Sequence, residues 1–253
     1  MLRKIILIVI ILIMAGQLVL WADTGKTYKV AVDHNYPPFS LYNRKTASIE
    51  GLAVDVTKVI CEHAQIQCDF VLMSHEESLK ALKAGEVDIV CSGPGLMMDR
   101  KANFLTTAKF FRSSSVFVGV KQVLKQLDKN DFTGLAIGVV QGSIQHQRLS
   151  SNYERRLDIK EYERFQDVLT ALALQEIDLG MLDILAVYYA FQNDKAMMFD
   201  VIGNPVNTGD GAFLAVRGEE KELLKKLNEG IFSVHYTREF EIINAKYYDF
   251  FIF

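Results

Sequence analysis

An octet that occurs twice constrains the fold of this chain more than any other feature. Residues 81–88 and 171–178 both read Ala-Leu, three variable positions, Glu, Val or Ile, and Asp. Each copy has the pattern of a helix end and a short turn, and a short apolar strand follows directly, at 89–91 and at 179–182. The repeat therefore predicts two similar α/β units within the 253 residues.

The first unit alternates strands with helices, an order that is typical of parallel α/β sheets. Its strand 28–32 leads into residues 34–39, where two prolines restrict the residues before them, so that a loop is expected rather than a helix. Apolar residues recur at helical spacing after Gly51. The helices and strands predicted next are 55–64, 68–73, 76–84 and 89–91.

The second unit is expected to interrupt the first. Strand 114–120 has the pattern of a crossover, and residues 201–211, with their glycines and proline, are interpreted as turns that lead back to strand 212–216. Two crossings make a hinge about which lobes close on a ligand. We therefore predict an α/β fold of two Rossmann-like lobes joined by a two-crossing hinge. The other elements expected are 122–127, 135–140, 166–174, 179–182, 184–191, 219–232 and 239–248.

One charged residue of interest follows each repeated strand: Arg100 after the first and Asp183 after the second. A cation from one unit and an anion from the other can together hold a zwitterion. This arrangement favours a two-lobed binder of amino acids over an enzyme with one compact active site. The net charge is −3, and the sequence has no polybasic segment. Both observations argue against a nucleic-acid partner.

The N-terminus has the pattern of a signal peptide. Arg3 and Lys4 precede an apolar run, and Ala22 offers a small residue before the expected cleavage point. An uncleaved membrane anchor is the alternative, although the run is shorter than the roughly 20 residues of a span. Residues 1–22 are therefore interpreted as a cleaved signal peptide, which implies export.

Export makes disulfide bonds possible. Cys61 and Cys68 bracket a predicted helix-to-strand turn, which can bring its two ends within reach of a disulfide. Two buried thiols are the alternative for this pair. Cys91 lies in an apolar strand and is interpreted as a buried thiol.

The order of several short motifs along some 220 residues resembles the type II periplasmic solute-binding proteins for polar amino acids, which are extracellular family 3 of the ABC importers. The tail 245–250 and the spacing of Cys61 and Cys68 resemble most the lysine/arginine/ornithine and histidine binders. The other matching residues are Asp33, Tyr36, Pro38, Phe39, 51–55, 85–88, Gly93, Leu96, Asp99, Arg100, 139–143, Asp178 and Asp183.

The resemblance implies a periplasmic receptor that is monomeric, has no cofactor, binds a free amino acid and docks on an inner-membrane ABC permease. A basic ligand is expected: arginine, lysine, ornithine or histidine. One lobe is expected to comprise residues 23–113 and 212–253, and the other residues 114–211, with hinge segments at the ends of the second lobe.

The resemblance also assigns the groups that hold the ligand's backbone. Arg100 is expected to bind the α-carboxylate, because a guanidinium donates two parallel hydrogen bonds to it; the alternative is a surface arginine. Asp183 is expected to bind the α-ammonium, with a helix cap as the alternative. Gln141 and Ser143 stand at a predicted helix start, which favours an anion; Ser143 also suits a plain N-cap.

The ligand's side chain is expected to face Asp33 and Tyr36, a carboxylate for its cation and a ring for its methylenes. For Tyr36 the alternative is packing beside the prolines. His75 stands where the family usually has an aromatic residue, and stacking of its imidazole or a helix cap are both open. Gly93 and Gly95 flank a proline in a stretch that is often rich in serine, and Met97 replaces the family's usual threonine, so ligand preference is open to drift.

Two other functions remain open from the sequence. Cyclohexadienyl dehydratases resemble the same family, but an enzyme needs a general acid in the cleft, and Asp33, Asp183 and His75 are explained as ligand-binding groups. A sensor that reports ligand occupancy to a membrane partner is the second alternative. The five histidines are scattered along the chain, so we predict no metal site.

Overall fold

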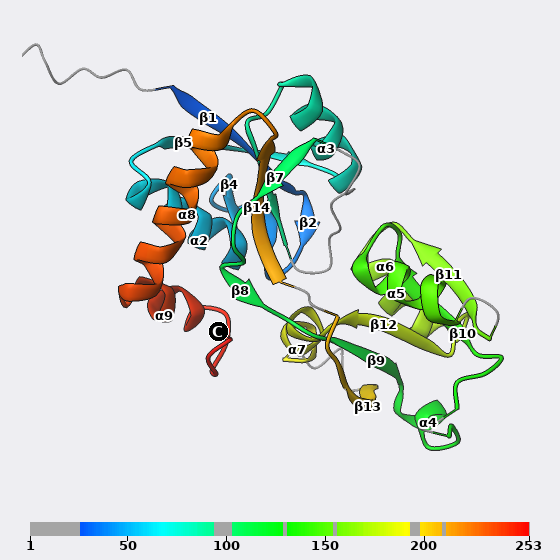
Figure 1. Cartoon of the computed structure of the whole chain (residues 1–253). Coiled ribbons are helices and arrows are strands. Elements are labelled where there is room, and N and C mark those ends of the chain that lie inside the picture. The colour runs from blue at the N-terminus through cyan, green and yellow to red at the C-terminus, as the bar shows by residue number, and fades with distance from the viewer. Residues whose placement is uncertain are drawn as a thin grey trace, which may run out of the picture.

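A computed structural model describes residues 26–93, 103–128, 131–153, 156–192, 198–208 and 211–252. The described chain forms two lobes, each built on its own sheet (Figure 1). The predicted signal peptide, residues 1–22, lies outside the described residues. Within the described part of the chain, no helix has the length and apolarity needed to cross a membrane.

The sheet of the first lobe runs in the order β5-β1-β6-β14-β7, with β8 beside β14. Strands β5, β1 and β6 are parallel, whereas β14 runs antiparallel to β6, so the sheet is mixed rather than wholly parallel as predicted. The strands are β1 (Thr27–Asp33), β5 (Gln67–Met73), β6 (Ile89–Ser92), β7 (Phe104–Thr106), β8 (Phe111–Arg112) and β14 (Gly211–Arg217).

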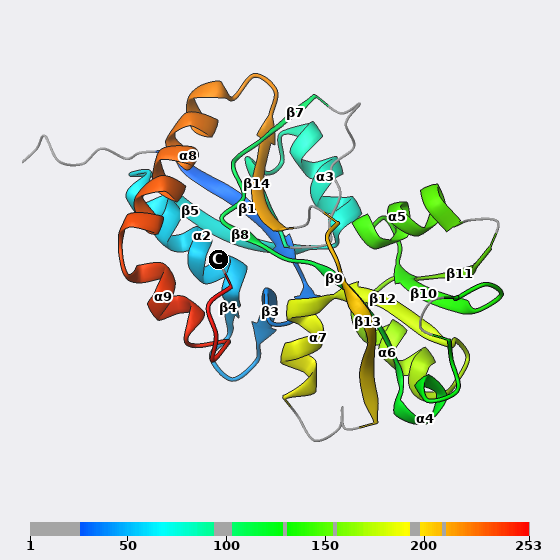
Figure 2. The same ribbon diagram turned by 60° about the horizontal axis from the view of Figure 1, so that its bottom comes forward.

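Helices cover both faces of this sheet because alternate strand residues point to opposite sides. Val30 and Val32 belong to the core that includes α2 and α8, whereas Ala31 packs in a smaller cluster with α3. Figures 1 and 2 show α2 and α8 on one face of the sheet and α3 on the other. The helices are α2 (Leu52–His63), α3 (His75–Ala84), α8 (Lys221–Tyr236) and α9 (Glu239–Asn244).

A small antiparallel sheet links the end of β1 to the start of α2. It contains β2 (Asn35–Tyr36), β3 (Ser40–Asn43) and β4 (Ser48–Glu50), so the predicted loop 34–39 includes a two-residue strand. Gly51 ends it with φ of 137°, and a Cβ there would collide with the carbonyl of Phe39. Only glycine allows the chain to turn into α2 at this point.

The sheet of the second lobe runs in the order β11-β10-β12-β9-β13. Strands β11, β10 and β12 are parallel, and β9 and β13 close the sheet in antiparallel pairing. The elements are β9 (Ser115–Val120), α4 (Lys121–Leu124), β10 (Ala136–Val140), α5 (Ile144–Tyr153), β11 (Asp158–Tyr162), α6 (Phe165–Ala173), β12 (Leu179–Asp183), α7 (Ile184–Phe191) and β13 (Phe199–Val206).

The prediction of turns at 201–211 was wrong for the first part of that range, because β13 extends to Val206. The pairing of β13 with β9 shifts between Ile202 and Val206, and Gly203 has φ of 77°. Glycine and proline therefore mark an irregularity within a strand here, not its end.

The repeated octet has the same structure in both lobes. The backbone of Asp88 donates to the Lys29 carbonyl at 2.9 Å, and its carboxylate accepts from the Lys29 N–H at 3.0 Å. Asp178 makes the same two bonds with Ala136, at 2.9 and 2.8 Å. Each aspartate thus fixes the start of a central strand to its neighbour, and both are structural, as the sequence indicated.

Two crossings join the lobes, from β8 to β9 and from β13 back to β14. The hydroxyls of Ser115 and Thr208 lie 3.2 Å apart, so a hydrogen bond connects the two crossing segments. The predicted two-lobed fold with a two-crossing hinge is confirmed.

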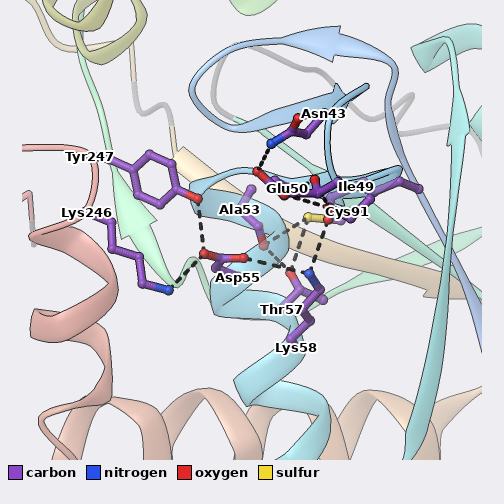
Figure 3. Close-up of polar contacts among 12 residues, drawn as sticks. Asn43, Ile49, Glu50, Ala53, Asp55, Thr57, Lys58, Cys91, Lys246 and Tyr247 are labelled. Carbon is purple, nitrogen blue, oxygen red and sulfur yellow. Dashed lines mark hydrogen bonds and ion pairs between the residues drawn. The ribbon is translucent and has the colours of Figure 1, made fainter.

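The C-terminal residues contact both lobes. On the first lobe, the Tyr247 hydroxyl donates to the Asp55 carboxylate at 3.1 Å, and Lys246 lies 3.3 Å from the same oxygen (Figure 3). On the second lobe, the Tyr188 hydroxyl donates to Asp249 at 2.6 Å. The residues that follow α9 therefore connect α2 of the first lobe with α7 of the second.

The predicted disulfide between Cys61 and Cys68 is present and joins α2 to β5. Cys91 is a buried free thiol, 3.3 Å from the Thr57 hydroxyl (Figure 3). Burial raises the pKa of the Cys91 thiol to about 12, so it stays protonated and unreactive.

Candidate ligand-binding site

A cavity of about 80 Å³ lies between the lobes. One water needs roughly 10–15 Å³ by the same measure, so the cavity has room for a small molecule. Its wall combines apolar side chains with a few charged ones, as ligand pockets usually do. The lining residues are Asp33, His34, Tyr36, Ser74, His75, Val140, Gln141, Ser143, Gln145, Glu163, Arg164, Phe165, Met181, Leu182 and Asp183.

The first lobe contributes Asp33, which ends β1, and Tyr36, which lies in β2. The Asp33 carboxylate is partly exposed and lies 3.7 Å from the His34 imidazole. Ligands of open α/β sheets bind at the carboxyl ends of the strands, which is where the sequence placed Asp33. The structure thus puts both predicted side-chain contacts on the cavity wall.

His75 also lines the cavity, at the first position of α3. It is not the helix cap, which was one of its two interpretations. Ser74 caps α3: its hydroxyl accepts from the Glu77 N–H at 3.3 Å, and the Glu77 carboxylate accepts from the Ser74 N–H at 2.9 Å. This reciprocal capping box satisfies the helix start and leaves His75 half-buried in the cleft.

Aromatic rings meet across the cavity. Tyr36 of the first lobe lies 6.4 Å from Phe165 of the second, measured between ring centroids, and 5.0 Å from Phe39. Gly93 stands behind Tyr36 and not on the cavity wall: a Cβ at Gly93 would come within 3.3 Å of the tyrosine ring. Glycine thus allows the ring of Tyr36 to pack against the backbone.

Asp183 ends β12 and is only 2% exposed. Its Oδ1 accepts hydrogen bonds from the N–H groups of Leu185 at 2.9 Å and Ala186 at 3.0 Å. These bonds cap α7, so the capping role considered from the sequence is real, and Asp183 also lines the cavity. Burial first, and then the nearby Asp183 carboxylate, raise the pKa of Tyr248.

Ser143 likewise has two roles. Its side chain is buried and accepts a hydrogen bond from the His146 N–H at 3.0 Å, which caps α5, and it lines the cavity. Gln141 is exposed at the rim of the same wall. Next to Ser143, the Gln145 amide donates to the Ser115 hydroxyl at 2.9 Å and so connects the cavity wall with the hinge.

Three residues that stand together on the second lobe's wall were not predicted from the sequence: Glu163, Arg164 and Phe165. They follow β11, a strand of mostly charged and exposed residues that gave no apolar signal. Had β11 been recognised, its carboxyl end would have pointed to these residues. Arg100 and Gly95, which were predicted as ligand contacts, lie outside the described residues.

The family of this chain is identified by its similarity to known proteins. Residues 28–250 match the sequence profile of the bacterial extracellular solute-binding proteins, family 3. The chain belongs to this family. The match spans both lobes and the hinge, and it confirms the family that the motifs indicated.

Individual relatives are distant but cover most of the chain. The L-arginine-binding protein of Pseudomonas aeruginosa is 24% identical over 231 residues, which are 89% of each chain. The lysine/arginine/ornithine-binding periplasmic protein of Escherichia coli is 23% identical and covers 91% of this chain and 90% of its own. The structure of an ancestral arginine-binding protein bound to arginine has a TM-score of 0.76 at 20% identity, with 88% of this chain and 98% of that one covered.

Proposed function

We propose that this member of the family is a periplasmic receptor for a basic amino acid and delivers it to an ABC permease in the inner membrane. The observation that carries the proposal is the placement of carboxylates on both walls of one cavity between the lobes, with Asp33 on one side and Asp183 on the other. A ligand with two cationic groups complements such a cavity.

The proposed clamp uses both ends of the amino acid. Asp183 binds the α-ammonium, and Arg100, by resemblance, binds the α-carboxylate with help from Ser143 and its helix start. Asp33 faces the side-chain cation, and Tyr36 covers the methylenes. His75, Gln141, Gly93 and Gly95 complete the predicted contact set, with Gly93 acting through the ring of Tyr36.

The lobes that close on the ligand are proposed as residues 23–113 with 212–253, and residues 114–211. Closure about the two crossings excludes water and lets both walls contact one small molecule. Relatives whose names specify arginine, lysine and ornithine support a basic ligand, and the word periplasmic in one of these names supports the location. We propose a monomer without cofactor or catalysis, exported through residues 1–22.

Thermal unfolding with a panel of ligands tests this function. A chain without residues 1–22 is unfolded, refolded to remove carried-over ligand, and heated with each of the twenty amino acids, ornithine or citrulline. Ligand at 1,000 times its Kd adds about 4 kcal/mol to the free energy of unfolding, which raises Tm by about 10 °C for a chain of this size. We expect this increase with basic amino acids, and a flat panel would contradict the function.

A further inference from the structure

Glu163 is a charged group of the cavity that the proposed clamp does not use. It lies on the second lobe between β11 and α6, and it lines both the inner cavity and a wider groove that opens beside it. Residues of α3 and α5 line the groove, and Figure 2 shows the ribbons of these two helices near each other. Glu163 therefore stands where the inner cavity meets the solvent-facing groove.

The Glu163 carboxylate has no hydrogen bond or ion pair with any other residue in the described part of the chain. Its neighbour Arg164 is bound elsewhere: the guanidinium Nε lies 2.9 Å and Nη2 lies 2.8 Å from the two Asp167 oxygens. This bidentate pair holds the guanidinium on Asp167, and Asp167 is the main cause of the raised pKa of Arg164, to which the charge of Glu163 adds a smaller contribution. The charge of Glu163 thus remains available to a ligand.

The charges of the described cavity wall are unbalanced. Asp33, Glu163 and Asp183 are carboxylates, and Arg164 is engaged by Asp167. Asp33 belongs to one lobe and Glu163 to the other, so their charges repel each other when the lobes approach. A cation between them removes the repulsion and is attracted by both lobes at once.

We propose, building on the proposed function, that Glu163 determines specificity by binding the distal cation of the ligand from the second lobe, opposite Asp33. The ligand class is an amino acid with a long cationic side chain, whose ammonium or guanidinium reaches the junction with the groove. Because the contact requires both lobes, the side-chain charge itself favours the closed form. Neutral side chains of equal length lack this contribution.

Calorimetric titration of arginine and of citrulline, its neutral counterpart of similar length, tests the proposal. Glu163→Gln should lower the affinity for arginine at least 10-fold, which corresponds to about 1.4 kcal/mol of binding free energy. The affinity for citrulline should change less than 3-fold. The ratio of the two affinities is the measured quantity. Because Glu163 is exposed and makes no hydrogen bond or ion pair in the described part of the chain, the variant should keep the Tm of the wild type.

Glu161→Gln is the matched control. Glu161 lies in β11 on the same lobe, carries the same charge and does not line the inner cavity; it lies 3.5 Å from His146. The arginine-to-citrulline ratio should stay within 2-fold in this variant. If Glu163→Gln and Glu161→Gln lower the arginine-to-citrulline ratio equally, any negative charge on this lobe has the same effect as Glu163. That result would overturn the proposal.

The role of Glu163 and the receptor function can be tested separately. If the wild type binds arginine and Glu163→Gln leaves the ratio unchanged, the role of Glu163 is wrong and the receptor function stands. If the refolded wild type binds neither arginine nor any other amino acid, the proposed function itself fails.

Discussion

Replacing Asp183 by asparagine should weaken ligand binding about 100-fold while leaving the fold intact. Removing one member of a buried charge pair costs roughly 2–5 kcal/mol of binding free energy. Asparagine keeps an oxygen that can accept from the N–H groups of Leu185 and Ala186, so the cap of α7 survives. Calorimetric titration with arginine measures the affinity, and thermal unfolding measures the fold.

Two further variants separate binding from capping. Asp183→Ala also loses the cap and should cost about 1 kcal/mol of stability in addition. Asp178→Asn makes the same chemical change just before the other end of β12, where the carboxylate accepts from the N–H of Ala136. Asp178 does not line the cavity, so binding should stay within 3-fold of the wild type. If Asp183→Asn binds arginine as the wild type does, Asp183 does not hold the α-ammonium.

Replacing Phe39 by alanine should lower the free energy of unfolding by about 3–5 kcal/mol, the usual cost of removing a fully buried phenylalanine. Phe39 is 0% exposed and stacks on Phe111 at 5.7 Å between centroids, where the chain leaves the first lobe. It also supports the ring of Tyr36. Urea denaturation measures the change, and arginine affinity should fall as well because Tyr36 loses its support.

Phe232→Ala provides the control for this prediction. Phe232 lies on α8 and is 62% exposed, so its loss should change stability by less than about 0.5 kcal/mol. If both variants unfold at the same urea concentration, the packing of Phe39 against Tyr36 and Phe111 does not contribute to the stability of the first lobe.

Much of the fold was predictable because the signals are local. The octet marks the same turn in both lobes, and the aspartate of each copy forms the same pair of backbone bonds. Apolar strands such as β6 and β12 were recognised for the same reason. β11 was missed because it is a polar edge strand, and β13 was misread because Gly203 lies inside it.

The candidate site was predictable only in part. Asp33 and Asp183 are the last residues of β1 and β12, and Tyr36 and Ser143 stand shortly after β1 and β10. Parallel strands place such residues at one edge of the sheet. The contact of Phe165 with Tyr36 depends on how the lobes face each other, which no local pattern encodes. Glu163 was missed for the same reason, and because the strand before it was missed.

Calorimetric titration of arginine into the refolded wild-type chain without residues 1–22 is the decisive test of the proposed receptor function. We predict saturable one-to-one binding with a Kd of about 1 μM or tighter, and binding of citrulline at least 10-fold weaker. Absence of saturable binding of arginine, lysine, ornithine and histidine would contradict the account. Equal affinity for arginine and citrulline would contradict the role of the carboxylates on the cavity wall.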